Sequence, residues 1–366
     1  MTVHVLAGDI GGTRARFAVF AVGPRGPRLV HQDVHESRSY KTFEAALKDF
    51  LNVSLKQAVR GKLEITAATF GIAGPVVEQR VKTTNLPWIV DGRTVSRTFS
   101  IPAVTLLNDL VAVGLGAIAA PPGKLTILHK GRPKHTGGNL AVIAAGTGLG
   151  EAAFIWDGHE HVACGTEGSH ADFAPQDGLQ DELLAWLRSE YGHVSFERVA
   201  SGSTISKIYE FFVDEQRVKE SKQAAAYIAA ADDENVAVVE LAESGRSEAA
   251  MRAIELWSRV YGAEAGNLAL KCLATAGVYV CGGVSARLAP ILASGLPSRN
   301  KNGKSPFVDA FLAKGRMRPL LEAMPVAVCL EPRAGLLGAA THAASAALAA
   351  APAKKDKKKK ETGARR

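Results

Sequence analysis

The sequence has little cysteine: four in 366 residues, and no two of them form a C-x-x-C pair. The spacing typical of a zinc knuckle or a dithiol redox motif is therefore missing, and a reducing cytosol is the simplest compartment. Aromatic residues make up only 6%, but the hydrophobic share of 47% and the charged share of 22% are ordinary for globular proteins. This composition excludes a disordered chain, a collagen-like fibre and a disulfide-stapled miniprotein. At roughly 150 residues per domain, the length predicts about two domains.

Targeting and membrane signals are also lacking. Thr2, His4 and Asp9 interrupt the start, and no basic region precedes an apolar stretch, so we expect no secretory signal. Residues 334–353 carry no Asp, Glu, Lys or Arg, but most of them are alanine. Alanine gains little from lipid and favours helices in water. The segment therefore predicts a terminal helix packed on the body of a cytoplasmic protein with no membrane partner.

Strong basicity is missing from most of the chain, although the formal net charge is +8. Residues 351–366 contribute +6 of it, which leaves +2 on residues 1–350. A lysine run at a chain end is usually a solvated, disordered tail, so we expect no nucleic-acid partner. Truncation after Ala350 is expected to leave the kinetic constants unchanged, and a loss of activity would contradict this interpretation of the tail.

Two glycine-rich turns each lie between apolar segments. Residues 3–7 predict a strand that ends in Gly8-Asp9-Ile10-Gly11-Gly12-Thr13, and residues 16–20 predict a strand again. Residues 140–144, the turn at 145–150 (AGTGLG) and residues 151–156 repeat this order. In a dinucleotide-binding or Walker fold, a helix follows the glycine loop. Here a strand-like segment follows each turn, so hairpins are predicted instead. The repetition indicates a structural duplication.

The remaining pattern mixes helices and strands. Helical spacing of apolar residues predicts helices, and short apolar runs predict strands. The predicted helices are 41–59, one starting at Leu110, 179–191 and 248–273; the predicted strands are 65–72, 104–107 and 277–283. Residues 214–247 are polar and alanine-rich, which predicts exposed helices, and residues 298–305 predict an exposed loop. The fold class is therefore α/β.

The glycine turns could bind phosphate. Each exposes backbone N–H groups without a side chain in the way, and each offers a hydroxyl, on Thr13 or Thr147. Asp9 stands at the end of the first strand, where it could hold a magnesium ion through water. A single glycine turn would more often only close a hairpin. Two such turns, one of them with an aspartate, favour a nucleotide site.

Further along, acids and an amide could bind a neutral polyol. Asn108 and Asp109 stand where a strand meets a helix, and Glu167, His170 and Glu197 follow in loop-like segments. By themselves, Asp109 could be a helix cap and Glu197 a salt-bridging residue. The spacing fits no compact metal motif. Ionised carboxylates accept strong hydrogen bonds from hydroxyls, so a sugar site is the better interpretation.

In this order, the motifs resemble those of the bacterial glucokinase family, within the superfamily of actin, hexokinase and heat-shock ATPases. The matching segments are GDIGGTRAR at 8–16, LND at 107–109, AGTGLG at 145–150, EGSHADFAP at 167–175, GHVSFER at 192–198, CGGV at 281–284 and PRAGLLG at 332–338. The resemblance runs from about residue 5 to 345 and excludes the tail. It implies a two-domain actin-like ATPase (ribonuclease H-like) fold with an interdomain cleft. The implied domains are 1–108 plus 334–350 and 109–333, with 351–366 as a disordered basic tail.

The resemblance also implies roles for individual residues. Asp109 is expected to be the general base for the sugar 6-hydroxyl, and Asn108, Glu167, His170 and Glu197 are expected to hold the other hydroxyls. ATP and Mg²⁺ are the implied cofactors. The residues expected to hold the phosphates are Asp9, Gly11, Gly12, Thr13, Gly146, Thr147 and Gly148, with Asp9 at the magnesium and Gly282 and Gly283 near the nucleoside.

The expected function is thus ATP-dependent glucose phosphorylation to glucose 6-phosphate, the first step of glycolysis. Three alternatives stay open at the level of sequence: a kinase of another hexose such as mannose or glucosamine, a kinase using ADP or polyphosphate, and a sugar sensor without turnover. No DNA-reading helical segment precedes Asp9, which disfavours the sensor. The oligomeric state, including a homodimer, also stays open.

Overall fold

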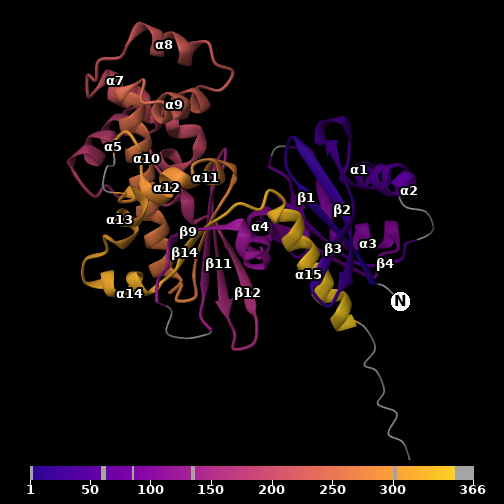
Figure 1. Cartoon of the computed structure of the whole chain (residues 1–366). Helices are drawn as coiled ribbons and strands as arrows, with labels where there is room; N and C mark the ends of the chain where they lie inside the picture. Colours follow the sequence, from indigo (N-terminus) through magenta and orange to yellow (C-terminus); the bar gives the residue numbers. More distant parts are fainter. Residues whose placement is uncertain (1–2, 59–62, 85, 133–136, 300–302, 351–366) are drawn as a thin grey trace, which may run out of the picture.

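Two β-sheets form the framework of the computed structural model, which describes residues 3–58, 63–84, 86–132, 137–299 and 303–350 (Figure 1). The predicted tail 351–366 lies outside this range. The first sheet has the order β3-β2-β1-β4-β8 and the second β12-β11-β10-β13-β14-β9. The strands of the first are β1 (Val3–Ile10), β2 (Arg14–Gly23), β3 (Gly26–Glu36), β4 (Ile65–Ile72) and β8 (Ala103–Asn108). Those of the second are β9 (Leu125–His129), β10 (Leu140–Ala145), β11 (Leu149–Trp156), β12 (His161–Thr166), β13 (Gly277–Cys281) and β14 (Val326–Cys329).

The two sheets repeat one topology. β1 pairs antiparallel with β2 and parallel with β4, and β10 pairs in the same way with β11 and β13. Each sheet adds a third antiparallel strand on one side, β3 or β12, and a further parallel strand on the other, β8 or β14. The topology thus shows the predicted duplication. Since parallel strands share one carboxyl edge, the turns after β1 and β10 both lie where such sheets carry ligands.

Helices surround both sheets, and a small third sheet packs against the core of the first. The small sheet contains β5 (Val76–Val77), β6 (Arg80–Lys82) and β7 (Ile89–Asp91). The helices are α1 (Phe43–Asp49), α2 (Leu55–Ala58), α3 (Gly92–Phe99), α4 (Asp109–Ala119), α5 (Gly178–Tyr191), α6 (Glu197–Ala200), α7 (Ile205–Asp214), α8 (Lys222–Ala229), α9 (Glu234–Glu243), α10 (Glu248–Lys271), α11 (Gly283–Arg287), α12 (Ala289–Ser294), α13 (Pro306–Leu312), α14 (Arg318–Ala323) and α15 (Ala334–Ala350). In the described ranges, no helix combines the length and the apolar character needed to cross a membrane.

Two helices, α4 and α15, cross between the sheets (Figure 1). α4 leaves the first sheet at β8, but its Val111 packs with Val142 and Phe154 of the second sheet. α15 follows β14 of the second sheet, but its alanine face packs on β1 and β4 of the first. The helices approach closely at two glycines, because a Cβ atom at Gly116 would collide with the Ala334 carbonyl, and one at Gly338 with the Ala112 carbonyl. The two helices are therefore in direct backbone contact where they cross.

The structure corrects three sequence predictions. The single helix at 41–59 is interrupted by a π-helical turn at Phe50–Ser54, where Asn52, Val53 and Ser54 are weak helix formers. The exposed helices expected within 214–247 include α9, which buries Ala237, Val238, Val239, Leu241 and Ala242 because its apolar run packs into the core around α10. The exposed loop expected at 298–305 ends in a buried residue, Ser305, whose Oγ accepts a bond from Val308 N–H at 3.0 Å and caps α13; residues 300–302 lie outside the described range.

Candidate active site

The first glycine turn joins β1 to β2. Gly11 N–H donates to the Arg14 carbonyl at 3.0 Å, and Ser37 Oγ donates to the Gly11 carbonyl at 2.9 Å. Ser37 N–H also donates to the Thr13 carbonyl at 2.9 Å, while the Thr13 side chain is exposed. The carbonyls of this turn are thus tied back to the protein. The turn can offer its open side to a ligand.

Asp9 lies at the base of this turn. Its Oδ2 accepts a hydrogen bond from Arg16 Nη1 at 3.0 Å, and a Cβ atom built at Gly335, in the first turn of α15, would be 3.1 Å from Asp9 Cγ. Burial raises the pKa of Asp9, and the Arg16 guanidinium opposes that rise. A carboxylate close to the N-terminus of a helix is favoured by the helix dipole. Asp9 therefore joins the first glycine turn to α15.

The second glycine turn, between β10 and β11, is held by the segment that follows α6. Gly202 N–H donates to the Gly146 carbonyl at 2.8 Å, and Ser203 Oγ donates to the Thr147 carbonyl at 2.6 Å. The turn that follows β13 packs on it, since Gly282 has a φ of +92° and a Cβ atom there would collide with the Ala145 carbonyl. Only glycine fits at position 282. Gly282 and Ala145, which are 137 positions apart in the sequence, thus lie together.

A cavity of about 330 Å³ opens beside this second turn. Its lining includes three residues predicted for ATP, namely Gly146, Thr147 and Gly283. It also includes residues that sequence reasoning missed, namely Gly202, Ser203, Ile205, Asp233, Asn235, Val236, Val239, Val284, Arg287 and Leu288. The Asp-x-Asn sequence before an apolar run could have predicted the start of α9. Nothing in it could have shown that α9 begins beside the turn after β10.

At the junction of β8 and α4, the helix cap and the predicted general base are two neighbouring residues. Asn108 is the N-cap of α4, with its Oδ1 accepting from Leu110 N–H at 3.0 Å and its Nδ2 donating to the Gly74 carbonyl at 3.2 Å. Asp109 is the first residue of α4, and its Oδ1 also accepts from Leu110 N–H at 3.0 Å. The capping role that the sequence left open for Asp109 thus belongs mainly to Asn108.

Asp109 is the point at which separate segments converge. Burial raises its pKa, and the charges of Asp9 and Glu167 raise it further, against the lowering effect of Leu110 N–H. Asp9 lies near the end of β1, just before the first glycine turn, and Glu167 directly follows β12. The predicted base, phosphate-side acid and sugar-side acid therefore lie close enough to affect one another's charge.

The remaining acids surround His170. Its Nε2 lies 3.8 Å from Glu167 Oε2, and its Nδ1 lies 3.8 Å from Glu197 Oε1. The side chains of Glu167 and His170 are 72% and 57% exposed, so their polar atoms are open to a ligand. Glu197 Oε2 accepts from Leu149 N–H at 3.0 Å, and a Cβ atom at Gly148 would lie 2.5 Å from it. Glu197 thus joins the sugar-side group to the second glycine turn.

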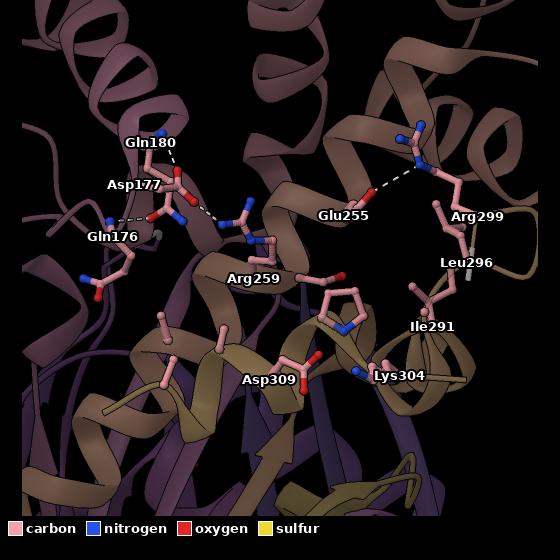
Figure 2. A pocket seen from close by; sticks show the side chains of 16 residues that line it. Gln176, Asp177, Gln180, Glu255, Arg259, Ile291, Leu296, Arg299, Lys304 and Asp309 are labelled. Carbon is pink, nitrogen blue, oxygen red and sulfur yellow. Dashed lines mark hydrogen bonds and ion pairs between the residues drawn. The ribbon is translucent and has the colours of Figure 1, made fainter. Parts of the chain in front are cut away.

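A separate cavity of about 580 Å³ lies among α5, α10, α12 and α13 (Figure 2). Two pairs of its charged groups interact: Arg299 Nε lies 3.2 Å from Glu255 Oε2, and Arg259 bonds Asp177. No predicted site residue lines it. This cavity is therefore distinct from the predicted site.

Comparisons with known proteins agree with the motif order. A family model described as Glucokinase matches residues 6–346. The chain is 35% identical to a curated glucokinase of Trichormus variabilis, over 93% of this chain and 98% of that protein. A crystal structure of glucokinase from an Antarctic psychrotroph superposes with a TM-score of 0.78 at 25% identity, covering 94% of this chain and all of that one. A ROK family glucokinase structure from Streptomyces griseus matches with a TM-score of 0.60 at 21% identity, over 93% and 99% of the two chains. The predicted actin-like ATPase fold class is confirmed.

Proposed function

The chain belongs to the glucokinase family, and on this premise we propose that it transfers the terminal phosphoryl group of ATP to the 6-hydroxyl of D-glucose. The products are glucose 6-phosphate and ADP, and the reaction is the first step of glycolysis in the cytoplasm. The observation that carries the proposal is the convergence of Asp109 with Asp9 on one side and Glu167 on the other. The Streptomyces griseus relative was crystallised with glucose and AMPPNP, which are the ligand classes that this arrangement suits.

On the sugar side, Asp109 accepts the proton of the 6-hydroxyl as that oxygen attacks phosphorus. An ionised carboxylate within hydrogen-bond reach suffices, because phosphoryl transfer depends mainly on alignment and charge neutralisation. Glu167, His170 and Glu197 bind the other hydroxyls. Asn108 uses one amide hydrogen on Gly74, and its second is left for the sugar.

On the nucleotide side, the two glycine turns hold the phosphates and the cavity beside Gly283 holds the nucleoside. The phosphate residues are Asp9, Gly11, Gly12, Thr13, Gly146, Thr147 and Gly148, and Gly282 shapes the turn next to Gly283. Asp9 fits a magnesium ion, because a single carboxylate beside a phosphate turn matches a cation that keeps most of its ligands as water and phosphate oxygen. When bound, the ion neutralises charge on the phosphates.

We further propose two domains, residues 1–108 with 334–350 and residues 109–333, that close on an interdomain cleft when glucose binds. The crossing of α4 and α15 supports this division, because it is the contact about which the two sheets could move. Closure excludes water, which otherwise competes with the sugar as phosphoryl acceptor.

A panel of acceptors and donors tests the proposed reaction. Product formation is measured with glucose, mannose and glucosamine, each combined with ATP, ADP or polyphosphate. We expect the highest kcat/KM for glucose with ATP. Faster turnover of another pair would correct the substrate, and tight glucose binding without product would identify a sensor.

A further inference from the structure

A buried carboxyl group without a hydrogen-bond partner lies under the sugar-binding segment proposed above, on which this inference rests. Glu151 is 1% exposed, and neither of its carboxyl oxygens has a partner among the residues that the structure describes. A Cβ atom built at Gly168 would collide with Glu151 Oε2. The carboxyl group is therefore in direct contact with the backbone between Glu167 and His170. Leaving a buried polar group unpaired costs free energy of folding, so the presence of a carboxyl group at this position needs an explanation.

Strand β11 supports the sugar-binding acids at two points. Glu151 pairs with Thr166 of β12, and Glu167 follows directly. Two residues earlier, Leu149 N–H donates to Glu197 Oε2 at 3.0 Å. Strand β11 thus contacts both Glu197 and the backbone between Glu167 and His170, through the Leu149 N–H and the Glu151 side chain.

The groups that face Glu151 come mainly from α10. Glu264 is fully buried and already bonded, with Lys271 Nζ 3.2 Å from its Oε1 and Asn267 Nδ2 2.8 Å from its Oε2. Burial is the main cause that raises the pKa values of Tyr261 in α10 and of Cys272 directly after it, and the charge of Glu151 contributes to both rises. The charge of Glu264 disfavours a second negative charge beside it, which contributes to raising the pKa of Glu151.

The pKa of Glu151 follows from this environment. Burial raises it first, the charge of Glu264 raises it further, and Lys271 opposes the rise, with a result of about 8. Glu151 is thus protonated at neutral pH and loses its proton under mildly alkaline conditions. The ionised form would place a second negative charge beside Glu264 without a partner, which favours entry of water and movement of the backbone above it.

We propose that Glu151, in its protonated form, is a positioning residue that fixes residues 167–170 for glucose binding, and that losing this proton weakens binding of the sugar. It acts through Glu167 and His170 and touches no substrate. Loss of the Glu151 proton at alkaline pH therefore lowers the affinity for glucose and not the affinity for ATP.

The test is the pH dependence of KM for glucose and for ATP in the wild type and three variants. In the wild type, KM for glucose rises above pH 8 while KM for ATP does not share that rise. Glu151→Gln keeps the size and removes the titration, so KM for glucose stays near the neutral wild-type value and the alkaline rise disappears. Glu264→Gln removes the charge that raises the pKa of Glu151, so the rise begins at a lower pH than in the wild type. Glu151→Ala raises KM for glucose at all pH values.

An unchanged alkaline rise in Glu151→Gln, or an unchanged onset in folded Glu264→Gln, overturns the inference. Thermal unfolding of each variant shows whether it is folded. Glu167→Gln distinguishes failure of the positioning role from failure of the proposed sugar site. If Glu167→Gln raises KM for glucose while Glu151→Gln keeps the alkaline rise, only the positioning role fails. If KM for glucose is unchanged in Glu167→Gln, the sugar site itself lies elsewhere.

Discussion

Replacing Asp109 with asparagine is expected to lower kcat for glucose phosphorylation by roughly 100-fold or more, the range for loss of a general base. Asparagine has the same size and can still accept a bond from Leu110 N–H, so α4 should begin normally. It cannot take up the proton of the hydroxyl. KM for glucose should change far less than kcat, because the other proposed sugar-binding groups remain.

The pH dependence of kcat gives a second readout for the same residue. Since burial raises the pKa of Asp109, the base becomes protonated at a higher pH than an exposed aspartate, and kcat should fall on the acid side accordingly. Asp172→Asn is the matched control, because its side chain is 90% exposed and bonds only to His193 among the described residues. Normal turnover by Asp109→Asn would show that another group accepts the proton.

Replacing Gly116 with valine is expected to destabilise the protein by about 2–3 kcal/mol. The added Cβ atom meets the Ala334 carbonyl, which is backbone and cannot rotate away, so α15 has to move from α4. The movement reaches the proposed phosphate site, since Gly335 lies against Asp9. We therefore expect both a lower midpoint of thermal unfolding and a higher KM for ATP.

Gly123→Val is the control for this substitution. Gly123 is exposed, its φ is not in the left-handed region, and a Cβ atom there meets nothing within 4 Å. It should unfold at nearly the wild-type temperature. Equal midpoints for the two variants would mean that the close crossing of α4 and α15 contributes little to stability.

Local signals in the sequence account for the parts of the fold that were predicted well. Strand β4 and helix α15 lie where their apolar patterns predicted them, and the glycine turns after β1 and β10 are hairpin turns. These features depend on period, helix propensity and glycine, all of which act over a few residues. The topological duplication followed from finding the same short pattern twice.

Features that depend on long-range contact could not be predicted. The sequence of α9 predicts an exposed helix. Only its packing around α10 in the folded protein shows that its valines and alanines are buried. Asn235 reaches the cavity at Gly146 across 89 positions of sequence. Glu151 reads as an ordinary strand residue, and its burial against Gly168 and Glu264 arises only when β11, β12 and α10 come together.

The most direct test of the account is a crystal structure of this chain with glucose and a non-hydrolysable ATP analogue. We predict that the sugar 6-hydroxyl lies within hydrogen-bond distance of Asp109 and faces the terminal phosphorus, with the triphosphate held by the two glycine turns. Glucose bound elsewhere, for example in the cavity beside Arg259 and Arg299, or a 6-hydroxyl directed away from phosphorus, would contradict it.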